Sequence, residues 1–142
     1  MNRQERERGS LSVEMVIWAV PLVLILSVII GAGRVGMANN AVDQIAHDVA
    51  RIASIARTST QAQNEASAAA ADLLAAQDLN CTQLTVDVDT SGFAAPAGTP
   101  AQVNVSISCT VRLDDLLIPG VPGSSTLTGT ASRIIDTYRE RS

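Results

Sequence analysis

An uncharged apolar run near the N-terminus constrains the fold of this chain more than any other feature. Residues 15–32, MVIWAVPLVLILSVIIGA, carry no charge, and Ser27 is the only polar side chain among them. As a helix of about 1.5 Å per residue the run is roughly 27 Å long, close to the hydrocarbon thickness of a bilayer. A core helix of a soluble domain would show polar residues every three or four positions. The run therefore predicts a transmembrane helix; the alternative is a secretory signal peptide cut at Gly31-Ala32-Gly33.

Basic residues on the two sides of the run predict its orientation. Arg3, Arg6 and Arg8 precede it, whereas only Arg34 follows it closely. Because an excess of basic residues marks the cytoplasmic side, we expect the N-terminus in the cytoplasm and the chain after Arg34 outside it. Pro21 is tolerated inside a bilayer and predicts a kink in the helix.

Helical periodicity continues beyond the apolar run. Apolar residues recur at spacings of three and four through Val42, Ile45, Val49, Ile52 and Ala56. This pattern predicts one helix from about Leu11 to Ala56, first embedded in the membrane and then amphipathic. A polar break at 58–64 precedes an alanine-rich stretch, which predicts a second helix from about Thr60 to Gln77.

After Asn80 the apolar period changes to two, which is typical of strands with one buried face. Residues 84–88 alternate in this way, and residues 102–113 alternate without exception. A loop rich in Gly and Pro, 91–101, separates them, and a third, less regular strand is expected at Thr126 to Tyr138 after the segment LLIPGVPG. The predicted class is α+β, with a long N-terminal transmembrane and amphipathic helix, a second Ala-rich helix and a small antiparallel sheet of about three strands.

The two cysteines lie in the β-rich part of the chain, which the predicted orientation places where disulfides persist. Alternation places Cys109 on the same face of its strand as the apolar core residues. A bridge between Cys81 and Cys109 would stabilise the fold by about 3 to 4 kcal/mol in the chain-entropy model. Two buried free thiols remain the alternative, and no metal site is expected because no ligand cluster surrounds either cysteine.

Composition and charge exclude several function classes. The net charge is -4 and the basic residues are spread along the chain, so a nucleic-acid partner is not expected. The single His47 lies in a helical stretch, and the acidic pairs Asp87/Asp89 and Asp114-Asp115 have no catalytic partner in the sequence. We therefore expect no enzyme, no catalytic residue, no cofactor and no small-molecule substrate.

The N-terminal segment Gly9-Ser10-Leu11-Ser12-Val13-Glu14, with Pro21 seven residues after Glu14, resembles the TadE-like pilus assembly proteins. These are pilin-like components of tight-adherence (Flp-type) pilus systems. Gly33-Arg34 after the span, the Ala-rich helices and the later segments Val121-Pro122-Gly123 and 128–133 are also similar to that family.

The resemblance implies cleavage by a prepilin peptidase between Gly9 and Ser10, which leaves Glu14 as the fifth residue of the mature chain. Burial of Glu14 at the edge of an apolar segment is costly without a partner, which makes it a functional candidate. In a pilin-like assembly that partner would be the free amine of Ser10, on the same chain or a neighbour. The alternative is that Glu14 only reaches the headgroups.

The sequence thus divides into a cytoplasmic leader (1–9), a transmembrane helix (10–33), an extracytoplasmic helical region (34–79) and a small β-rich lobe (80–142). The expected function is that of a minor pseudopilin in assembly of a type IV-like pilus. Its expected partners are the membrane, a prepilin peptidase, other pilin-like subunits and the assembly platform, with association into homo- or hetero-oligomers. The alternative is an uncleaved, membrane-anchored binding or scaffold protein of the secretion machinery.

Overall fold

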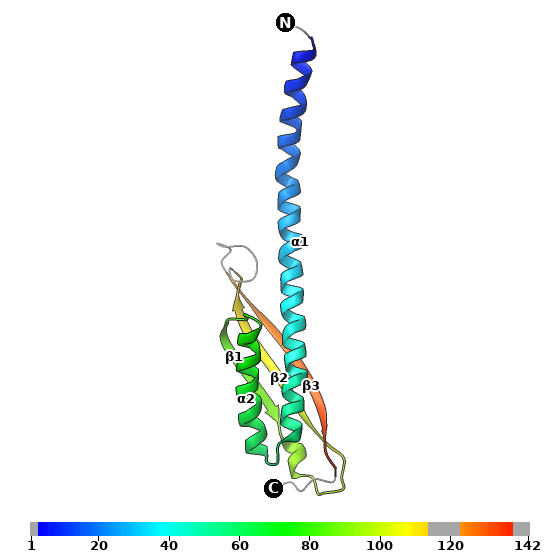
Figure 1. Cartoon of the computed structure of the whole chain (residues 1–142), viewed down its shortest axis with the longest axis vertical. Coiled ribbons are helices and arrows are strands. Elements are labelled where there is room, and N and C mark those ends of the chain that lie inside the picture. The colour runs from blue at the N-terminus through cyan, green and yellow to red at the C-terminus, as the bar shows by residue number, and fades with distance from the viewer. Residues whose placement is uncertain (1–2, 114–122, 138–142) are drawn as a thin grey trace.

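The computed structural model describes residues 3–113 and 123–137, with side chains from residue 14 onward. In chain order its elements are α1 (Arg3–Ile55), α2 (Ser59–Ala76), β1 (Cys81–Asp89), the 3-10 turn η1 (Ser91–Ala94), β2 (Ala101–Arg112) and β3 (Ser124–Ile135). The predicted order of a long helix, a second helix and three antiparallel strands is confirmed, and with it the α+β class. Figure 1 shows α1 running the length of the molecule, with the other elements gathered around its C-terminal half.

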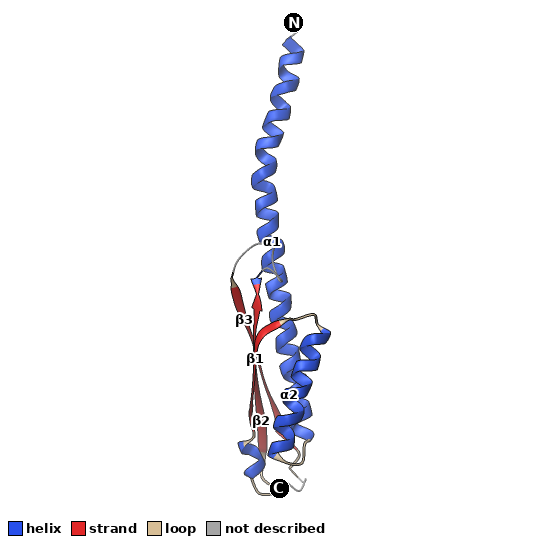
Figure 2. Cartoon of the chain, turned by 90° about the vertical axis from the view of Figure 1, so that its left-hand side faces the viewer, coloured by secondary structure: helices blue, strands red, loops and turns tan. Residues whose placement is uncertain are grey.

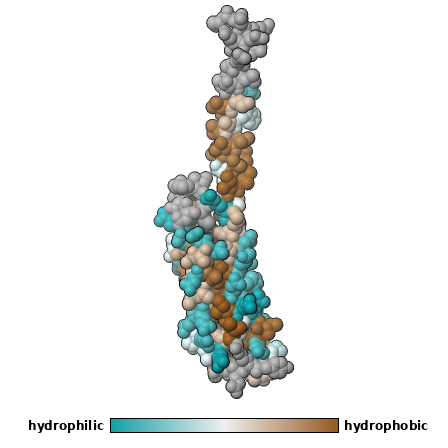
Figure 3. Space-filling view, viewed as in Figure 1, coloured by the Kyte–Doolittle hydropathy of each residue, from teal (hydrophilic) through white to brown (hydrophobic). Residues whose placement is uncertain are grey.

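The segment of α1 from Met15 to Ile30 lies apart from the lobe and is apolar on all sides except at Ser27. Its large apolar side chains from Met15 to Ile30 are all exposed, between 51% and 77%. Figure 3 shows this as a brown stalk above the mixed surface of the lobe. A core helix of a soluble domain would be buried, so that interpretation is excluded. The helix is long and apolar enough to cross a membrane, and it is compatible with a single-pass membrane anchor.

The C-terminal half of α1 supplies one wall of the hydrophobic core. Its buried face is a stripe of small and medium side chains at helical spacing: Ala38, Val42, Ile45, Ala46, Val49, Ala50, Ala53 and Ala56. The predicted amphipathic stripe is therefore confirmed, although Ile52 lies at its margin and is only partly buried. The helix continues without a break through the glycines at 31, 33 and 36.

The second helix packs beside α1 through alanines. Thr58 is its N-cap, and the Thr58 hydroxyl oxygen accepts a hydrogen bond of 3.1 Å from the backbone N–H of Gln61. Its buried residues recur every four positions, at Ala62, Ala66, Ala70 and Leu74. Because alanine adds little width, α2 approaches α1 and the sheet closely. Figure 2 shows both helices on the same face of the sheet.

The sheet has the order β1-β2-β3, and both pairings are antiparallel. Strand β2 is therefore the central strand of the sheet. Its helix-facing residues are fully or almost fully buried: Val103, Val105, Ile107, Cys109 and Val111. The opposite face of the sheet carries mainly polar side chains, and neither of the two helices that the structure describes covers it (Figure 2).

Strand β3 lies under α1, and a glycine sets how closely they meet. A Cβ atom added to Gly129 would lie 2.5 Å from the carbonyl oxygen of Val42 and 2.9 Å from the Cα of Asp43. The inward positions around it, Leu127, Ala131 and Ile135, are buried. The sequence made this strand look irregular because the positions nearest α1 hold Gly and Ala in place of larger apolar residues.

Two boundaries and the burial of one strand differ from the sequence-based expectation. The helix α1 begins at Arg3, not near Leu11, because the polar leader continues the same helical backbone. Strand β1 is less buried than predicted: Val88 is buried but Leu84 is 36% exposed, since β1 is an edge strand that α2 covers only in part. The third strand ends at Ile135, and Tyr138 and residues 114–122 lie outside the described residues.

Replacing Gly129 with Ala should destabilise the lobe by about 1 to 3 kcal/mol, because the methyl group has no space against the α1 backbone. Thermal or denaturant unfolding of the full chain in detergent would measure the loss. Gly36→Ala is the matched control. Nothing lies within 4 Å of a Cβ built there, so the change should leave stability unaltered or raise it by up to about 1 kcal/mol. Equal effects of the two substitutions would contradict this account of the contact.

Candidate functional site

The first candidate residue, Glu14, lies at the N-terminal edge of the exposed apolar segment. It borders a shallow surface groove along one side of α1, with Met15, Trp18, Ala19 and Leu22. Glu14, Trp18 and Leu22 follow one another at intervals of one helical turn, so the carboxylate stands at the end of an apolar strip. A carboxylate in this position needs either water, headgroups or a cationic partner.

The residues of the expected cleavage site, Gly9 and Ser10, belong to the backbone of the same helix. Both lie within α1, and Ser10 precedes Glu14 by four residues. Residues four apart in a helix lie on the same face, so the backbone nitrogen of Ser10 and the side chain of Glu14 are about one turn apart along the axis. Cleavage between Gly9 and Ser10 stays a prediction.

Pro21 lies inside α1, which remains helical on both sides of it. A proline has no N–H to donate, so the carbonyl oxygen of Ile17, four residues earlier, lacks its usual helical hydrogen bond. Between one and two turns after Pro21, the Ser27 hydroxyl donates a hydrogen bond of 2.8 Å to the carbonyl oxygen of Val23, which satisfies the hydroxyl within the helix. The kink expected at Pro21 stays a prediction.

Cys81 and Cys109 form a disulfide, with their Cα atoms 5.3 Å apart. Cys109 lies opposite Leu84 in the register, and Cys81 lies opposite Val111, so the bridge joins neighbouring strands near a register shift. Cys109 is fully buried in the core, and Cys81 is partly buried beside it. The bridge fixes the edge strand β1 to the central strand β2, and the free-thiol alternative is excluded.

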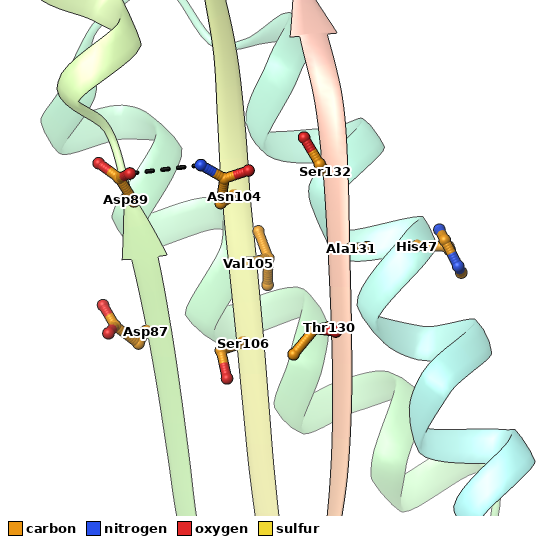
Figure 4. Close-up of a pocket in the computed structure, with 9 residues that line it drawn as sticks. All are labelled: His47, Asp87, Asp89, Asn104, Val105, Ser106, Thr130, Ala131 and Ser132. Carbon is orange, nitrogen blue, oxygen red and sulfur yellow. Dashed lines mark hydrogen bonds between the residues drawn. The ribbon is translucent and has the colours of Figure 1, made fainter.

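A polar trough lies across the outer face of the sheet. Figure 4 shows its lining, which comes from the three strands and α1: Asp87, Asp89, Asn104, Val105, Ser106, Thr130, Ala131, Ser132 and His47. The register stacks these residues in two cross-strand rows, Asp87–Ser106–Thr130 and Asp89–Asn104–Ser132. The two carboxylates lie at the β1 side of the trough, and His47 lies on α1 beyond β3.

Asp89 is held in the ionised form by its neighbours. Its carboxylate accepts hydrogen bonds from the backbone N–H of Ser91 at 3.0 Å and from the Asn104 amide at 3.3 Å. Hydrogen bonds from Ser91 and, to a smaller extent, from Asn104 lower the pKa of this exposed carboxyl. Asp89 therefore carries its negative charge throughout the neutral range.

The sequence did not reveal this trough. Alternation identified Asp87 and Asp89 as outward-facing, but the neighbours of each depend on strand order and register, which local patterns do not encode. His47 is distant in sequence and reaches the trough only because α1 lies under β3. Within residues 14–113 and 123–137, no three or more His, Cys, Asp or Glu side chains come together as metal ligands.

Comparison with known protein families identifies a match in the N-terminal part of the chain. Residues 9–51 match the family model described as TadE-like protein. The matched segment runs from the expected cleavage site through the exposed apolar helix into the part of α1 that forms the core. Neither the curated proteins nor the solved structures contain a match to this chain. The resemblance that the N-terminal residues indicated is thus confirmed over this segment.

Replacing both cysteines with alanine should lower the free energy of unfolding by about 3 to 4 kcal/mol, the value expected for closing a loop of this size. Denaturant unfolding of the full chain in detergent, with and without reductant, would measure it. Reductant should destabilise the native protein and leave the double variant unchanged. A double variant as stable as the native chain would show that the bridge adds nothing to the fold.

Proposed function

We propose that this chain, whose residues 9–51 match the TadE-like family, is a pilin-like membrane protein that takes part in assembling a tight-adherence (Flp-type) pilus. The observation that carries the proposal is the division of α1 into two halves. The segment 15–30 is apolar and exposed, whereas the C-terminal half supplies one wall of the core of a small folded lobe. A single continuous helix that anchors a lobe in this way is compatible with a subunit that the pilus assembly machinery extracts from the bilayer along the helix axis.

We further propose that a prepilin peptidase cleaves between Gly9 and Ser10. Before cleavage Glu14 lies about three turns inside a helix that begins at Arg3. After cleavage it lies in or next to the first turn of the new helix, where unpaired N–H groups favour a negative charge. The new amine of Ser10 adds a positive charge one turn away. Cleavage would therefore change Glu14 from a costly group into a stabilised one.

In this proposal the protein acts as a structural component and not as an enzyme. The N-terminus lies in the cytoplasm, the lobe lies outside it, and the apolar half of α1 contacts lipid before assembly and other apolar helices afterwards. Glu14 of one subunit then pairs with the Ser10 amine of a neighbour, so that neither charge is buried alone. The partners are the peptidase, other pilin-like subunits and the assembly platform.

The alternative, an uncleaved anchored scaffold, is separated from this proposal by the N-terminus of the mature chain. Substituting Gly9→Ala should block cleavage, because a Cβ is added at the residue that the peptidase must accept. Intact mass measurement on protein from cells with the active peptidase should give a chain starting at Ser10 for the native sequence and at Met1 for the variant. Ala19→Gly, in the apolar segment, is a control that should still be cleaved. A native chain that starts at Met1 would contradict the cleavage proposal and favour the scaffold.

The role of Glu14 is tested separately with Glu14→Gln, which removes the charge and keeps the size of the side chain. The variant should still be cleaved, but its recovery in the pilus or in complexes with other pilin-like subunits should fall by about a hundredfold or more, because breaking a buried ion pair costs about 3 to 5 kcal/mol and each 1.4 kcal/mol is a factor of about ten. Co-purification after membrane solubilisation would measure it. Normal recovery would mean that Glu14 only reaches the headgroups.

A further inference from the structure

Two charged residues that flank the apolar segment fix the height of the lobe relative to a bilayer. Glu14 precedes the segment and Arg34 follows it. The distance between them along one unbroken helix is roughly 30 Å at about 1.5 Å per residue, and the hydrocarbon core of a bilayer is about as thick. Because a charge inside the hydrocarbon is costly, the helix cannot slide far in either direction. Arg34 therefore lies at the edge of the hydrocarbon on the side of the lobe.

The lobe begins at about the level of Arg34 and not beyond it. Gly129 of β3 meets the backbone of Val42, and β3 starts five residues earlier, at Ser124. Five residues of a strand cover about 16 Å, which a helix covers in about ten residues. Figure 1 shows β3 starting beside the middle of α1 and running in the same direction as the helix. Ser124 thus lies at the level of residues 31–34, whereas α2 ends short of this level (Figure 1).

Burial along α1 agrees with this level. Gly31 is buried, whereas Gly33 in the same helix is exposed. Val35 is partly buried and Ala38 is buried. The stripe that packs on the lobe therefore continues at helical spacing from Val42 back to Gly31, inside the apolar run. Along the helix axis the lobe overlaps the last turn of the segment that the bilayer would cover.

The residues at this end of the lobe are suited to the polar layer of a membrane. Arg112 is the last residue of β2 and pairs with Ser124 in the register, and both are exposed, as is Arg34. The headgroup layer on each side of the hydrocarbon is about 5 to 8 Å thick. Guanidinium groups at that depth can donate hydrogen bonds to phosphate oxygens. We call Arg34, Arg112 and Ser124 the membrane-side end of the lobe.

The level of this end, and not its charge, selects the partner. Asp78 is exposed after α2, and Asp114-Asp115 follows β2 in the sequence. A net positive charge that would attract anionic lipid is therefore not assumed. Burial of the apolar segment holds the helix at its depth, and the rigid connection through α1 places the lobe accordingly.

We propose that the membrane-side end of the lobe lies within the phospholipid headgroup layer, an inference that rests on the membrane anchor in the proposed function. Arg34 binds lipid phosphate at the edge of the hydrocarbon, and the strands rise from the headgroups away from the bilayer. No stalk separates the lobe from the membrane. Extraction of the anchor along its axis would therefore also pull the lobe out of the headgroup layer.

A series of labels along β3 tests this contact in the full chain reconstituted into phosphatidylcholine vesicles. Ser124→Cys, Thr128→Cys and Ser132→Cys each place one reactive thiol on the exposed outer face of the same strand. The native cysteines are paired with each other and do not react. Successive positions are about 13 Å apart, so only the first lies within the headgroup layer. Each thiol carries the same fluorophore, and the quencher is a lipid with a nitroxide on its headgroup.

The label at Ser124 should lose most of its fluorescence, the label at Thr128 should lose little, and the label at Ser132, the matched control, should lose none. Adding phosphatidylglycerol to the vesicles should leave this pattern unchanged, because the anchor sets the depth. Quenching at Ser124 that requires the anionic lipid would contradict a contact set by level. Equal quenching at all three positions would show that the lobe lies on its side, and it would overturn the proposal.

The single tryptophan, Trp18, tests the anchor in the same samples. It lies in the apolar segment, and lipids brominated on their acyl chains should quench its fluorescence. Quenching of Trp18 without quenching of the Ser124 label would reject the headgroup contact alone and leave the anchor in place. A Trp18 that these lipids do not quench would reject the membrane anchor, and with it both the proposed function and the contact.

Discussion

The contact between the backbone of α1 and Gly129 of β3 is the constraint on which the lobe depends. One helix contains both the exposed apolar segment and the residues that pack on the sheet. Its C-terminal half contacts the sheet only through a stripe of Val, Ile and Ala. Side chains this small bury little surface unless the layers lie very close together. Gly129 permits that approach, and the alanines of α2 permit the same on the other side of α1. A thin core is thus compensated by short distances between layers and by the disulfide on β1.

The patterns that repeat over many residues were sufficient to predict the elements. The uncharged run at 15–32, the helical stripe from Val42 to Ala56 and the strict alternation at 102–113 each involve side chains of one kind in one environment. Such repeats indicate the secondary structure directly, because buried residues recur about every 3.6 residues in a helix and every second residue in a strand. The N-terminal motif added the family resemblance that the match over 9–51 confirms.

The remaining features depend on contacts between distant parts of the chain. Leu84 looks like a core residue by alternation, yet it is 36% exposed because β1 lies at the edge and α2 covers only part of it. Phe93 lies in a segment that reads as a loop, but the short η1 turn buries it against the core. The row that Asp89, Asn104 and Ser132 form on the outer face of the sheet follows from the register of two strand pairs. None of these could be predicted without knowing which strands are neighbours.

Continuity of α1 links the anchor to the surfaces of the lobe. The helix has no break between the exposed apolar segment and the residues that pack on the sheet, in spite of its glycines at 31, 33 and 36. A lobe fixed to such a helix cannot turn independently of its anchor by bending at a loop. Rotation of the apolar segment about its axis therefore turns the lobe by the same angle, so the environment of that segment and the direction in which the lobe faces are coupled.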